Sequence, residues 1–194
     1  MANFTDKFPA PTSSNILEVL AGSCDGRSVT VGSGTYTFPN VTGIQNISTS
    51  IIEITGTSIN YVPPSGTKYV GYKWNGKYEA TARGGISGFN VVYDGTVVTR
   101  AARGFAGNYM GSYHDSEETI NLEFIFDLTA SSTNKAAGKI LSSDWTTTKN
   151  IKITGRTYDT SYLGRMHGNT YMDGTSASGV KVFTIPQLVI TSYS

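Results

Sequence analysis

The chain predicts an all-β protein of the sandwich class, and three observations support this. Short segments of alternating apolar residues are separated by turn signals at intervals of about 8–12 residues, a spacing typical of sandwiches. The 194 residues include 22 glycines, and only 15% are charged, against roughly 25% in an average globular chain. Helical periodicity is nearly absent. We expect about ten to twelve strands arranged as a jelly roll or β-sandwich, with an extended N-terminal segment.

The clearest pair of strands lies in residues 56–74. Residues 59–62 are extended, residues 63–66 read Pro-Pro-Ser-Gly, and an extended pattern resumes at Tyr69. Successive side chains of a strand point to opposite faces. One face of the second strand is therefore expected in the core: Val70, Tyr72 and Trp74.

Other strands follow from the same alternation and from glycine-containing turns. Before residue 56 we expect strands at Ile16–Leu20 (or one helical turn), Ser28–Val31, Thr35–Phe38, Val41–Gln45 and Ser50–Ile54. Asn75-Gly76 predicts a hairpin that returns through Tyr78–Arg83, and Asp94-Gly95 predicts one between Phe89–Tyr93 and Thr96–Thr99. The later strands are expected at Thr119–Leu128, Ile151–Arg156, Val180–Phe183 and Leu188–Ile190.

Three long segments are predicted to be loops. Residues 130–147 are rich in serine, threonine and asparagine, with a short helix expected near Asn134–Leu141. Residues 101–116 and 158–179 combine glycine with aromatic side chains. Exposed loops of this kind often carry binding residues.

The order of segments predicts three parts. Residues 1–15 are polar with Pro9 and Pro11 and are expected to form a flexible or extended arm. Residues 16–55 form a β-rich N-terminal segment, and residues 56–194 form the jelly-roll domain. The N-terminus lacks the pattern of a secretory signal, and no run approaches about 20 apolar residues. We expect no membrane association and synthesis in a cytoplasm.

The charge and cysteine content exclude several functions. The net charge is +1 with scattered arginines, so we expect no nucleic-acid partner. Cys24 is the only cysteine, which rules out an intrachain disulfide and a thiolate metal cluster. It is interpreted as a buried or incidental thiol. No phosphate-binding glycine loop is present, and no cofactor is expected.

Two polar clusters are candidates for chemistry. Residues 114–118 read His-Asp-Ser-Glu-Glu, but neighbours on an extended chain point apart and seldom converge on one ion. Residues 166–174 join a histidine and an aspartate to nearby tyrosines, which suits stacking on a sugar ring or, alternatively, a subunit contact. We expect neither a catalytic nor a metal site. The candidate ligand-binding residues are Tyr109, Tyr113, Tyr162, His167 and Asp173.

Several stretches resemble virion structural proteins of marine bacteriophages and large algal viruses. They are ILEVLAGSCDGRSVTVGSGTYTFPNVTG, ITGTSINYVPPSGTKYVGYKW, FNVVYDGTVV, NLEFIFDL, residues 151–174 and the closing IPQLVI. The resemblance covers most of residues 16–194. It implies a trimer-forming jelly roll, similar to tumour-necrosis-factor heads, and a capsid, decoration or fibre component. It supplies no functional residues to transfer.

Three functions are considered on these grounds. The first is a non-enzymatic virion structural protein, assembled in a host cytoplasm as a homotrimer that contacts other virion proteins. Its interface is expected to use an aromatic and aliphatic face: Tyr72, Trp74, Phe124, Phe126 or Tyr193. The alternative is a receptor- or glycan-binding head that contacts a host-surface glycan. An enzyme is disfavoured, because it would need paired carboxylates among Asp115, Glu117, Glu118, Asp159 and Asp173.

Overall fold

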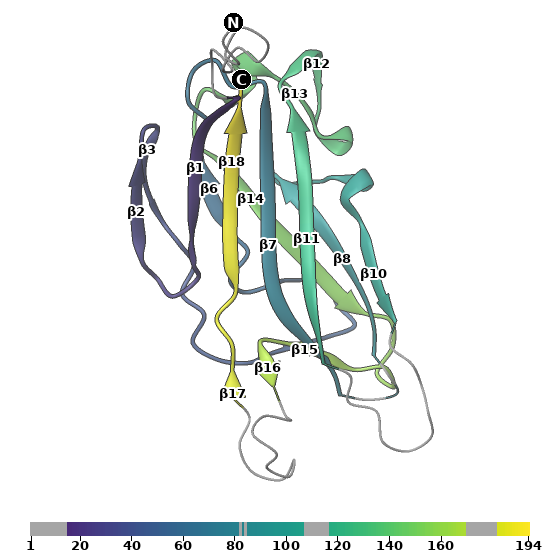
Figure 1. Cartoon of the computed structure of the whole chain (residues 1–194). Helices are drawn as coiled ribbons and strands as arrows, with labels where there is room; N and C mark the ends of the chain where they lie inside the picture. The colour runs from purple at the N-terminus through teal and green to yellow at the C-terminus, as the bar shows by residue number, and fades with distance from the viewer. Residues whose placement is uncertain (1–14, 82, 84, 107–116, 170–181) are drawn as a thin grey trace, which may run out of the picture.

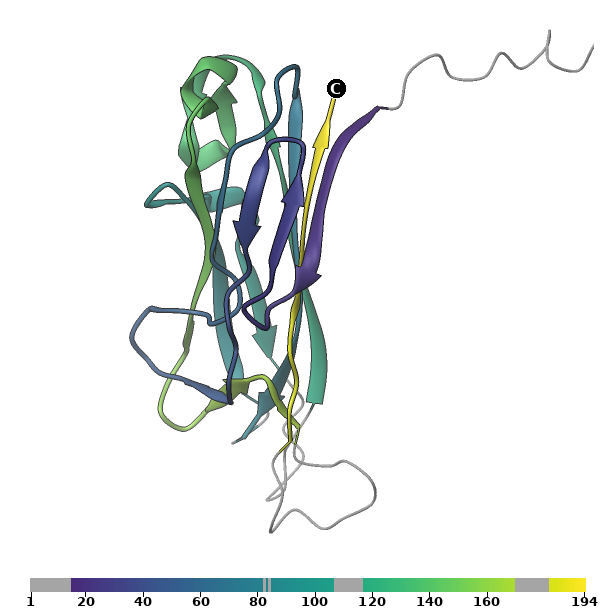
Figure 2. The ribbon, with the colours of Figure 1, turned by 90° about the vertical axis from the view of Figure 1, so that its left-hand side faces the viewer.

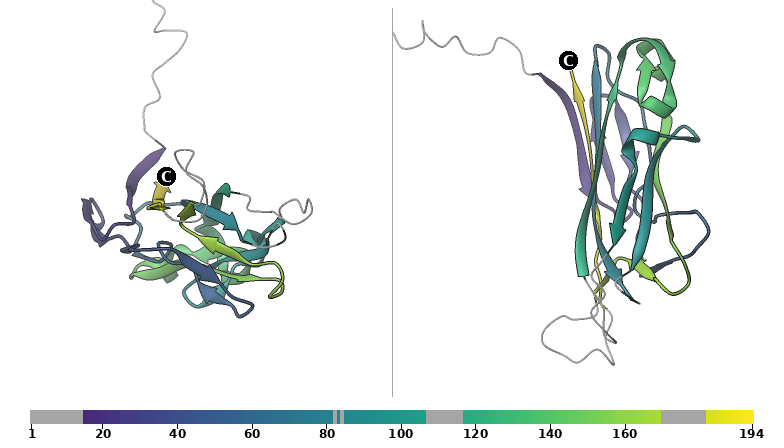
Figure 3. Two further views of the ribbon diagram at one scale, coloured as in Figure 1. Left: turned by 90° about the horizontal axis from the view of Figure 1, so that it is seen from below. Right: turned by 90° about the vertical axis from the view of Figure 1, so that its right-hand side faces the viewer.

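Two β-sheets packed face to face form the body of the protein. The computed structural model describes residues 15–81, 83, 85–106, 117–169 and 182–194. In Figure 1 the larger sheet faces the viewer, and strands of the second sheet lie behind it. Figure 3, in its right-hand view, shows the two layers side by side. The chain is an all-β sandwich of the jelly-roll type, which confirms the predicted class.

The first sheet has eight strands. Its continuous path runs through β1 (Ile16–Ser23), β18 (Gln187–Tyr193), β7 (Tyr69–Ala80), β11 (Glu117–Asp127), β13 (Lys139–Leu141) and β12 (Thr129–Asn134). Off this path, β15 (Gly164–Met166) pairs with both β7 and β4 (Gln45–Ile47). The pairings are antiparallel apart from β11 with β13.

The second sheet has six strands. Its path runs through β10 (Arg103–Ala106), β8 (Ile86–Tyr93), β14 (Lys149–Thr157) and β5 (Ile52–Glu53), while β6 (Ile59–Tyr61) pairs with β14 and β9 (Thr96–Val97) with β8. Two short ribbons are β2 (Ser28–Val31) with β3 (Gly34–Thr37), and β16 (Gly168–Asn169) with β17 (Val182–Phe183). Within the described residues, the 3-10 turns are η2 (Thr99–Ala101), η3 (Lys135–Ala137) and η4 (Ser142–Trp145).

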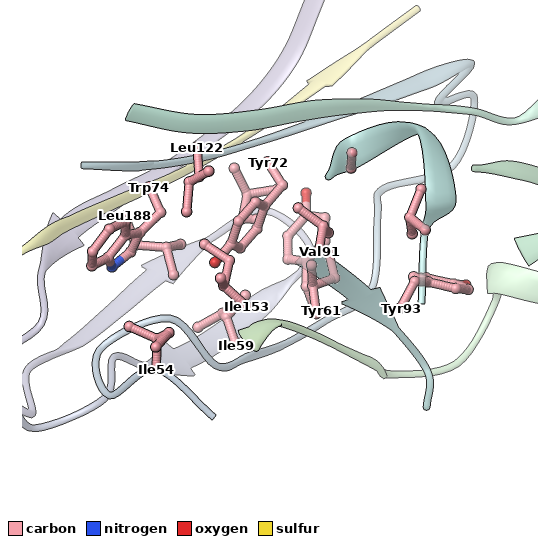
Figure 4. Close-up of a cluster of buried hydrophobic side chains, with 14 of the residues drawn as sticks. Ile54, Ile59, Tyr61, Tyr72, Trp74, Val91, Tyr93, Leu122, Ile153 and Leu188 are labelled. Carbon is pink, nitrogen blue, oxygen red and sulfur yellow. The ribbon is translucent and has the colours of Figure 1, made fainter. Parts of the chain in front are cut away.

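The hydrophobic core lies between the sheets and is rich in aromatic side chains. Figure 4 shows Tyr72, Trp74 and Leu122 of the first sheet facing Val91 and Ile153 of the second. The buried aromatic polar atoms bond to nearby acceptors. The Tyr72 hydroxyl donates to the Thr57 carbonyl at 2.7 Å, and the Trp74 indole donates to the Gly56 carbonyl at 2.9 Å. Such bonds offset the cost of removing polar groups from water.

Several predicted elements are confirmed. Val70, Tyr72 and Trp74 are all fully buried on one face of β7. The Asp94-Gly95 turn joins β8 to β9, and both residues have positive φ, at 45° and 79°. These are the angles that a two-residue hairpin turn of type I′ requires.

The Asn75-Gly76 hairpin prediction is wrong. Strand β7 runs without interruption from Tyr69 to Ala80 and pairs along its length with β11. The glycine serves a different purpose. A Cβ at Gly76 would lie 2.1 Å from the Trp74 ring, so the missing side chain makes room for that ring.

Other local predictions also need correction. The expected strands at Val41–Gln45 and Ser50–Ile54 are shorter and shifted, at β4 and β5. The expected helix near Asn134–Leu141 is one 3-10 turn between β12 and β13, within a segment predicted to be a loop. The predicted loops 101–116 and 158–179 contain β10, β15 and β16. Ile16–Leu20, for which strand and helical turn were both open, lies in strand β1.

Replacing Gly76 with alanine is expected to lower the free energy of unfolding by about 1–3 kcal/mol, because the new methyl group overlaps the Trp74 ring. Urea denaturation followed by Trp fluorescence measures the change. Gly71→Ala, on the same strand, is the matched control, since its Cβ would be 3.5 Å from its nearest neighbour. Equal losses in the two variants would show that the ring contact does not matter.

Candidate functional site

Of the five predicted ligand-binding residues, the structure describes Tyr162 and His167. Tyr109, Tyr113 and Asp173 lie outside the residues that the structure describes. Tyr162 is half-buried in the turn that follows β14. His167 is fully buried, so a role for its side chain as a surface contact is wrong.

His167 is buried because its neighbours are held between two other strands. Met166, directly before it, pairs with Gln45 of β4 and Tyr78 of β7. The imidazole then packs edge-on against the Trp74 ring, with centroids 6.2 Å apart. The backbone of His167 has a φ of 65°, which is unusual for a non-glycine residue.

Hydrogen bonds determine which ring nitrogen of His167 carries the proton. Its Nε2 lies 3.1 Å from the Thr55 carbonyl and 3.0 Å from the Thr55 hydroxyl, which itself donates to Gln45. Nε2 therefore carries the proton and donates. The buried Nδ1 has no partner in the described structure. Burial lowers the pKa of His167 from 6.5 to about 4, so the ring is neutral near pH 7.

A buried ion pair lies beside this histidine. Arg165 Nε donates to Glu79 Oε2 at 2.6 Å, and a second guanidinium nitrogen bonds the other carboxylate oxygen. The Glu79 side chain is fully buried and that of Arg165 is 8% exposed. A Cβ at Gly168 would lie within 3 Å of both partners, so the backbone packs closely over the pair. Within the described residues, both side chains of the pair are thus closed off from solvent.

Glu18 is a second buried carboxylate, which the sequence pattern did not predict. Glu18 on β1 accepts bonds from the Ser33 amide at 2.7 Å, the Ser33 hydroxyl at 2.6 Å and the Tyr61 hydroxyl at 2.8 Å. Glu18 thereby ties the β2–β3 ribbon, seen beside β1 in Figures 1 and 2, to the sandwich. A lone glutamate in the apolar run Ile16–Leu20, on the same face as Leu20, was the available signal.

Among the residues that the structure describes, the remaining reactive groups lie apart from one another. Cys24 is buried and donates to the Gly56 carbonyl at 3.0 Å, and burial raises its pKa to about 12, so it is not a thiolate nucleophile. Glu118 lies on β11 of the first sheet, while Asp159 follows β14 of the second. Among the described residues, no group of three His, Cys, Asp or Glu side chains could hold a metal ion.

An open hollow of about 430 Å³ lies between the turn that joins β6 to β7 and η4. Pro63, Pro64, Leu128 and Trp145 supply apolar walls, and serine and threonine residues supply hydroxyl groups. None of the described residues that line this hollow has a titratable side chain.

Several exposed apolar side chains lie together on the outer face of the first sheet. Val19, Thr191, Gly71 and Ile125 form one row across β1, β18, β7 and β11. Val19 is 47% exposed and Ile125 60% exposed. Tyr69, also exposed, pairs with Tyr193 in the next row. We name this surface, which faces the viewer in Figure 1, the assembly face: Leu17, Val19, Tyr69, Ile125 and Tyr193.

The aromatic residues expected at an interface divide between this face and the core. Tyr72, Trp74 and Phe126 are fully buried within the sandwich, so they cannot contact another subunit. They occupy inward positions of β7 and β11, and the outward positions carry the exposed residues. Phe124 is partly buried against the core, and Tyr193 is half-buried on the assembly face.

Two tyrosines form an exposed aromatic pair on the other sheet. Tyr158, directly after β14, is 70% exposed, and its ring meets that of Tyr162 edge-on at 6.0 Å. An aromatic ring with an open face is the feature that sugar rings stack on. This pair is where the structure places the predicted contact Tyr162.

Among the described residues, the structure has no helix long and apolar enough to cross a membrane.

Solved structures that match this chain include two weak matches to chains of one virus. One chain from the structure of infectious bursal disease virus, Gx strain, matches with a TM-score of 0.33 and 14% identity, covering 91% of this chain and 36% of that chain. A chain from the Gt strain matches with a TM-score of 0.29 and 13% identity, covering 95% and 46%. This chain thus spans less than half of either protein. At this level of similarity neither match bears on function.

No protein-family model and no curated protein matches the chain.

Proposed function

We propose that the protein is a structural component of a virion that acts by assembly, as a homotrimer in contact with other virion proteins. The observation that carries the proposal is the exposed apolar assembly face. The resemblance of several sequence segments to virion proteins supplies the class of particle. Its place of action would be the virion, after assembly in a host cytoplasm.

The assembly face fits a contact with another protein subunit. In a sandwich the inner faces are apolar, and outward positions are normally polar. Here apolar side chains on β1, β7 and β11 lie together on the outside. An ion pair between Lys73 and Glu123, 3.7 Å apart, is on the same face in a neighbouring row. Exposed apolar patches with a polar rim mark interaction sites.

Replacing Ile125 with lysine is expected to dissociate the trimer. A buried lysine at the centre of a subunit contact would lose its hydration without gaining a partner. Light scattering on a size-exclusion column should change from a mass near three times 20.8 kDa to a single 20.8 kDa chain. The unfolding midpoint of the monomer should be unchanged at low protein concentration, because Ile125 is already exposed.

The matched control is Ile51→Lys. Ile51 is 67% exposed and precedes β5 of the second sheet, away from the assembly face. It should leave the mass at three chains. A wild-type protein that is monomeric at all concentrations would exclude the homotrimer. A trimer that survives Ile125→Lys would exclude the assembly face as its interface.

We propose a receptor- or glycan-binding head as the second function. The exposed Tyr158–Tyr162 pair favours it, because an open tyrosine ring is suited to stacking on a sugar ring. It is compatible with a virion component, since binding and assembly would use opposite sheets. A trimer that binds no saccharide would exclude the glycan-binding function and leave only the structural role.

A further inference from the structure

Two glycines lie side by side on the outer face of the second sheet. Gly88 of β8 is directly opposite Gly104 of β10, and Arg156 of β14 is opposite Gly88 on its other side. The three residues form one row across three strands. Their neighbours Ser87 and Phe89 are buried, so the row points outward.

The fold itself does not require these glycines. At Gly76 and Gly155 an added Cβ would lie 2.1 Å and 2.7 Å from a neighbouring side chain. At Gly88 and Gly104 no atom lies within 4 Å of the Cβ position, and neither residue has a positive φ. Among the strand glycines of the described chain, only these two have such open space.

Paired glycines weaken a strand interior, because they add backbone entropy and bring no side chain to pack. A strand glycine is typical of a bulge, of a tight bend, or of a site that a ligand or another backbone approaches closely. The pairing of β8 with β10 and β14 continues through Gly88 and Gly104 without a register shift, which favours close approach. Gly88 and Gly104 thus make a flat floor of exposed backbone. We name this surface the glycine floor.

Aromatic and polar groups border the glycine floor. The Tyr158 amide donates to the Ile86 carbonyl at 2.8 Å, which places Tyr158 in the row next to Gly88. Its ring is 70% exposed and is supported by Tyr162. On the opposite side, Asn90 and Thr154 pair in the row beyond the floor. The floor therefore has an aromatic border on one side and amide and hydroxyl groups on the other.

Arg156 supplies a positive charge beside the glycine floor. Arg156 is exposed and has no carboxylate partner within the described part of the chain. The nearby Glu53 already bonds Lys152 at 2.8 Å. Asp159 accepts from the Ser161 amide at 2.8 Å within its own turn. A guanidinium without a partner, beside an open floor, is complementary to a carboxylate.

We propose that the glycine floor binds a carboxylated sugar unit of a glycan. The apolar face of the pyranose ring stacks on Tyr158 and lies over Gly88 and Gly104. The sugar carboxylate bonds Arg156, and ring hydroxyls bond the Asn90 amide. An acidic peptide would use the arginine but would need neither the floor nor the ring. The inference rests on the second function proposed above and gives it a location and a ligand class.

Titration of the trimer with digalacturonate and with 3′-sialyllactose tests the proposal. Binding is measured by ligand-observed NMR. Lactose is the neutral comparison. At least one acidic probe should bind at least about tenfold more tightly than lactose. Gly88→Val should weaken that binding at least about tenfold by filling the floor. Arg156→Gln should lower the affinity for the acidic probe to the affinity for lactose.

The unfolding midpoint of each variant is measured in the same samples as a control for folding. A valine at Gly88 suits an extended strand and meets no neighbour, so the unfolding midpoint should not fall. Gly43→Val, also in open space but before β4, should leave binding intact, and Arg100→Gln is the matched charge control.

Each other outcome overturns the proposal in a distinct way. Acidic-probe binding that survives Gly88→Val would keep the glycan function but exclude this location. Equal binding of lactose and the acidic probes would exclude the charge argument. Polyglutamate that binds in an Arg156-dependent, Gly88-independent manner would indicate a peptide surface. Absence of binding by any saccharide would exclude both the location and the second function.

Discussion

Replacing Arg165 with methionine is expected to lower the free energy of unfolding by about 3–5 kcal/mol, because the buried Glu79 carboxylate loses the guanidinium that neutralises it. Glu79 is fully buried on β7, in the strand that pairs with β11, β15 and β18. The lone carboxylate therefore destabilises the centre of the first sheet. Guanidinium denaturation at pH 7 measures it.

The control for Arg165→Met is Lys152→Met. Lys152 bonds Glu53 at 2.8 Å, but both side chains are about a third or more exposed, at 31% and 45%. An exposed pair contributes about 0–1 kcal/mol. The double replacement Glu79→Leu with Arg165→Met should recover part of the loss, since no lone charge remains. Equal losses in the two single variants would contradict a stabilising role for the buried pair.

Acidification from pH 6.5 to pH 4 is expected to cost the folded protein about 3 kcal/mol through His167 alone, since burial lowers its pKa from 6.5 to about 4. The folded pKa lies below the unfolded value. The unfolded chain therefore binds more protons in this window, and stability falls as the pH falls. The loss should continue through the folded pKa near 4 and level off below it.

The variant His167→Asn separates this effect from that of the carboxylates. Asparagine tolerates the φ of 65° at this position and cannot take up a proton. Asp94 and Asp127, whose pKa values are lowered by bonds from Lys135 and Thr129, also lose stabilising charge on acidification. They do so in both proteins, so the difference between the two stability–pH curves isolates His167. Parallel curves would contradict a buried neutral imidazole.

Local patterns predicted the parts of the fold that depend on neighbouring residues. The Asp94-Gly95 turn and the alternation of Thr119–Leu128 were sufficient, because each is set by adjacent side chains. The hairpin predicted from Asn75-Gly76 was wrong. The same dipeptide that suits a turn was placed in a strand by pairing with β11 and β18, and by the ring of Trp74.

The site residues depend on contacts that are distant in sequence, which is why the prediction failed for His167. Nothing between Met166 and Gly174 shows that β4 and β7 enclose this histidine. The glycine floor was missed for the same reason. Gly88 and Gly104 read as ordinary breakers, and only the register of β8, β10 and β14 brings them beside Arg156.

The position of β18 between β1 and β7 has a consequence for biosynthesis. Until residues 187–193 have been made, β1 has no partner in its sheet and β7 has an unpaired edge along Tyr69–Asn75. An unpaired edge strand readily joins another chain. A ribosome-bound chain is thus exposed to mispairing until β18 is inserted. Folding of the first sheet is expected to wait for residues 187–193, at a rate limited by this long-range closure.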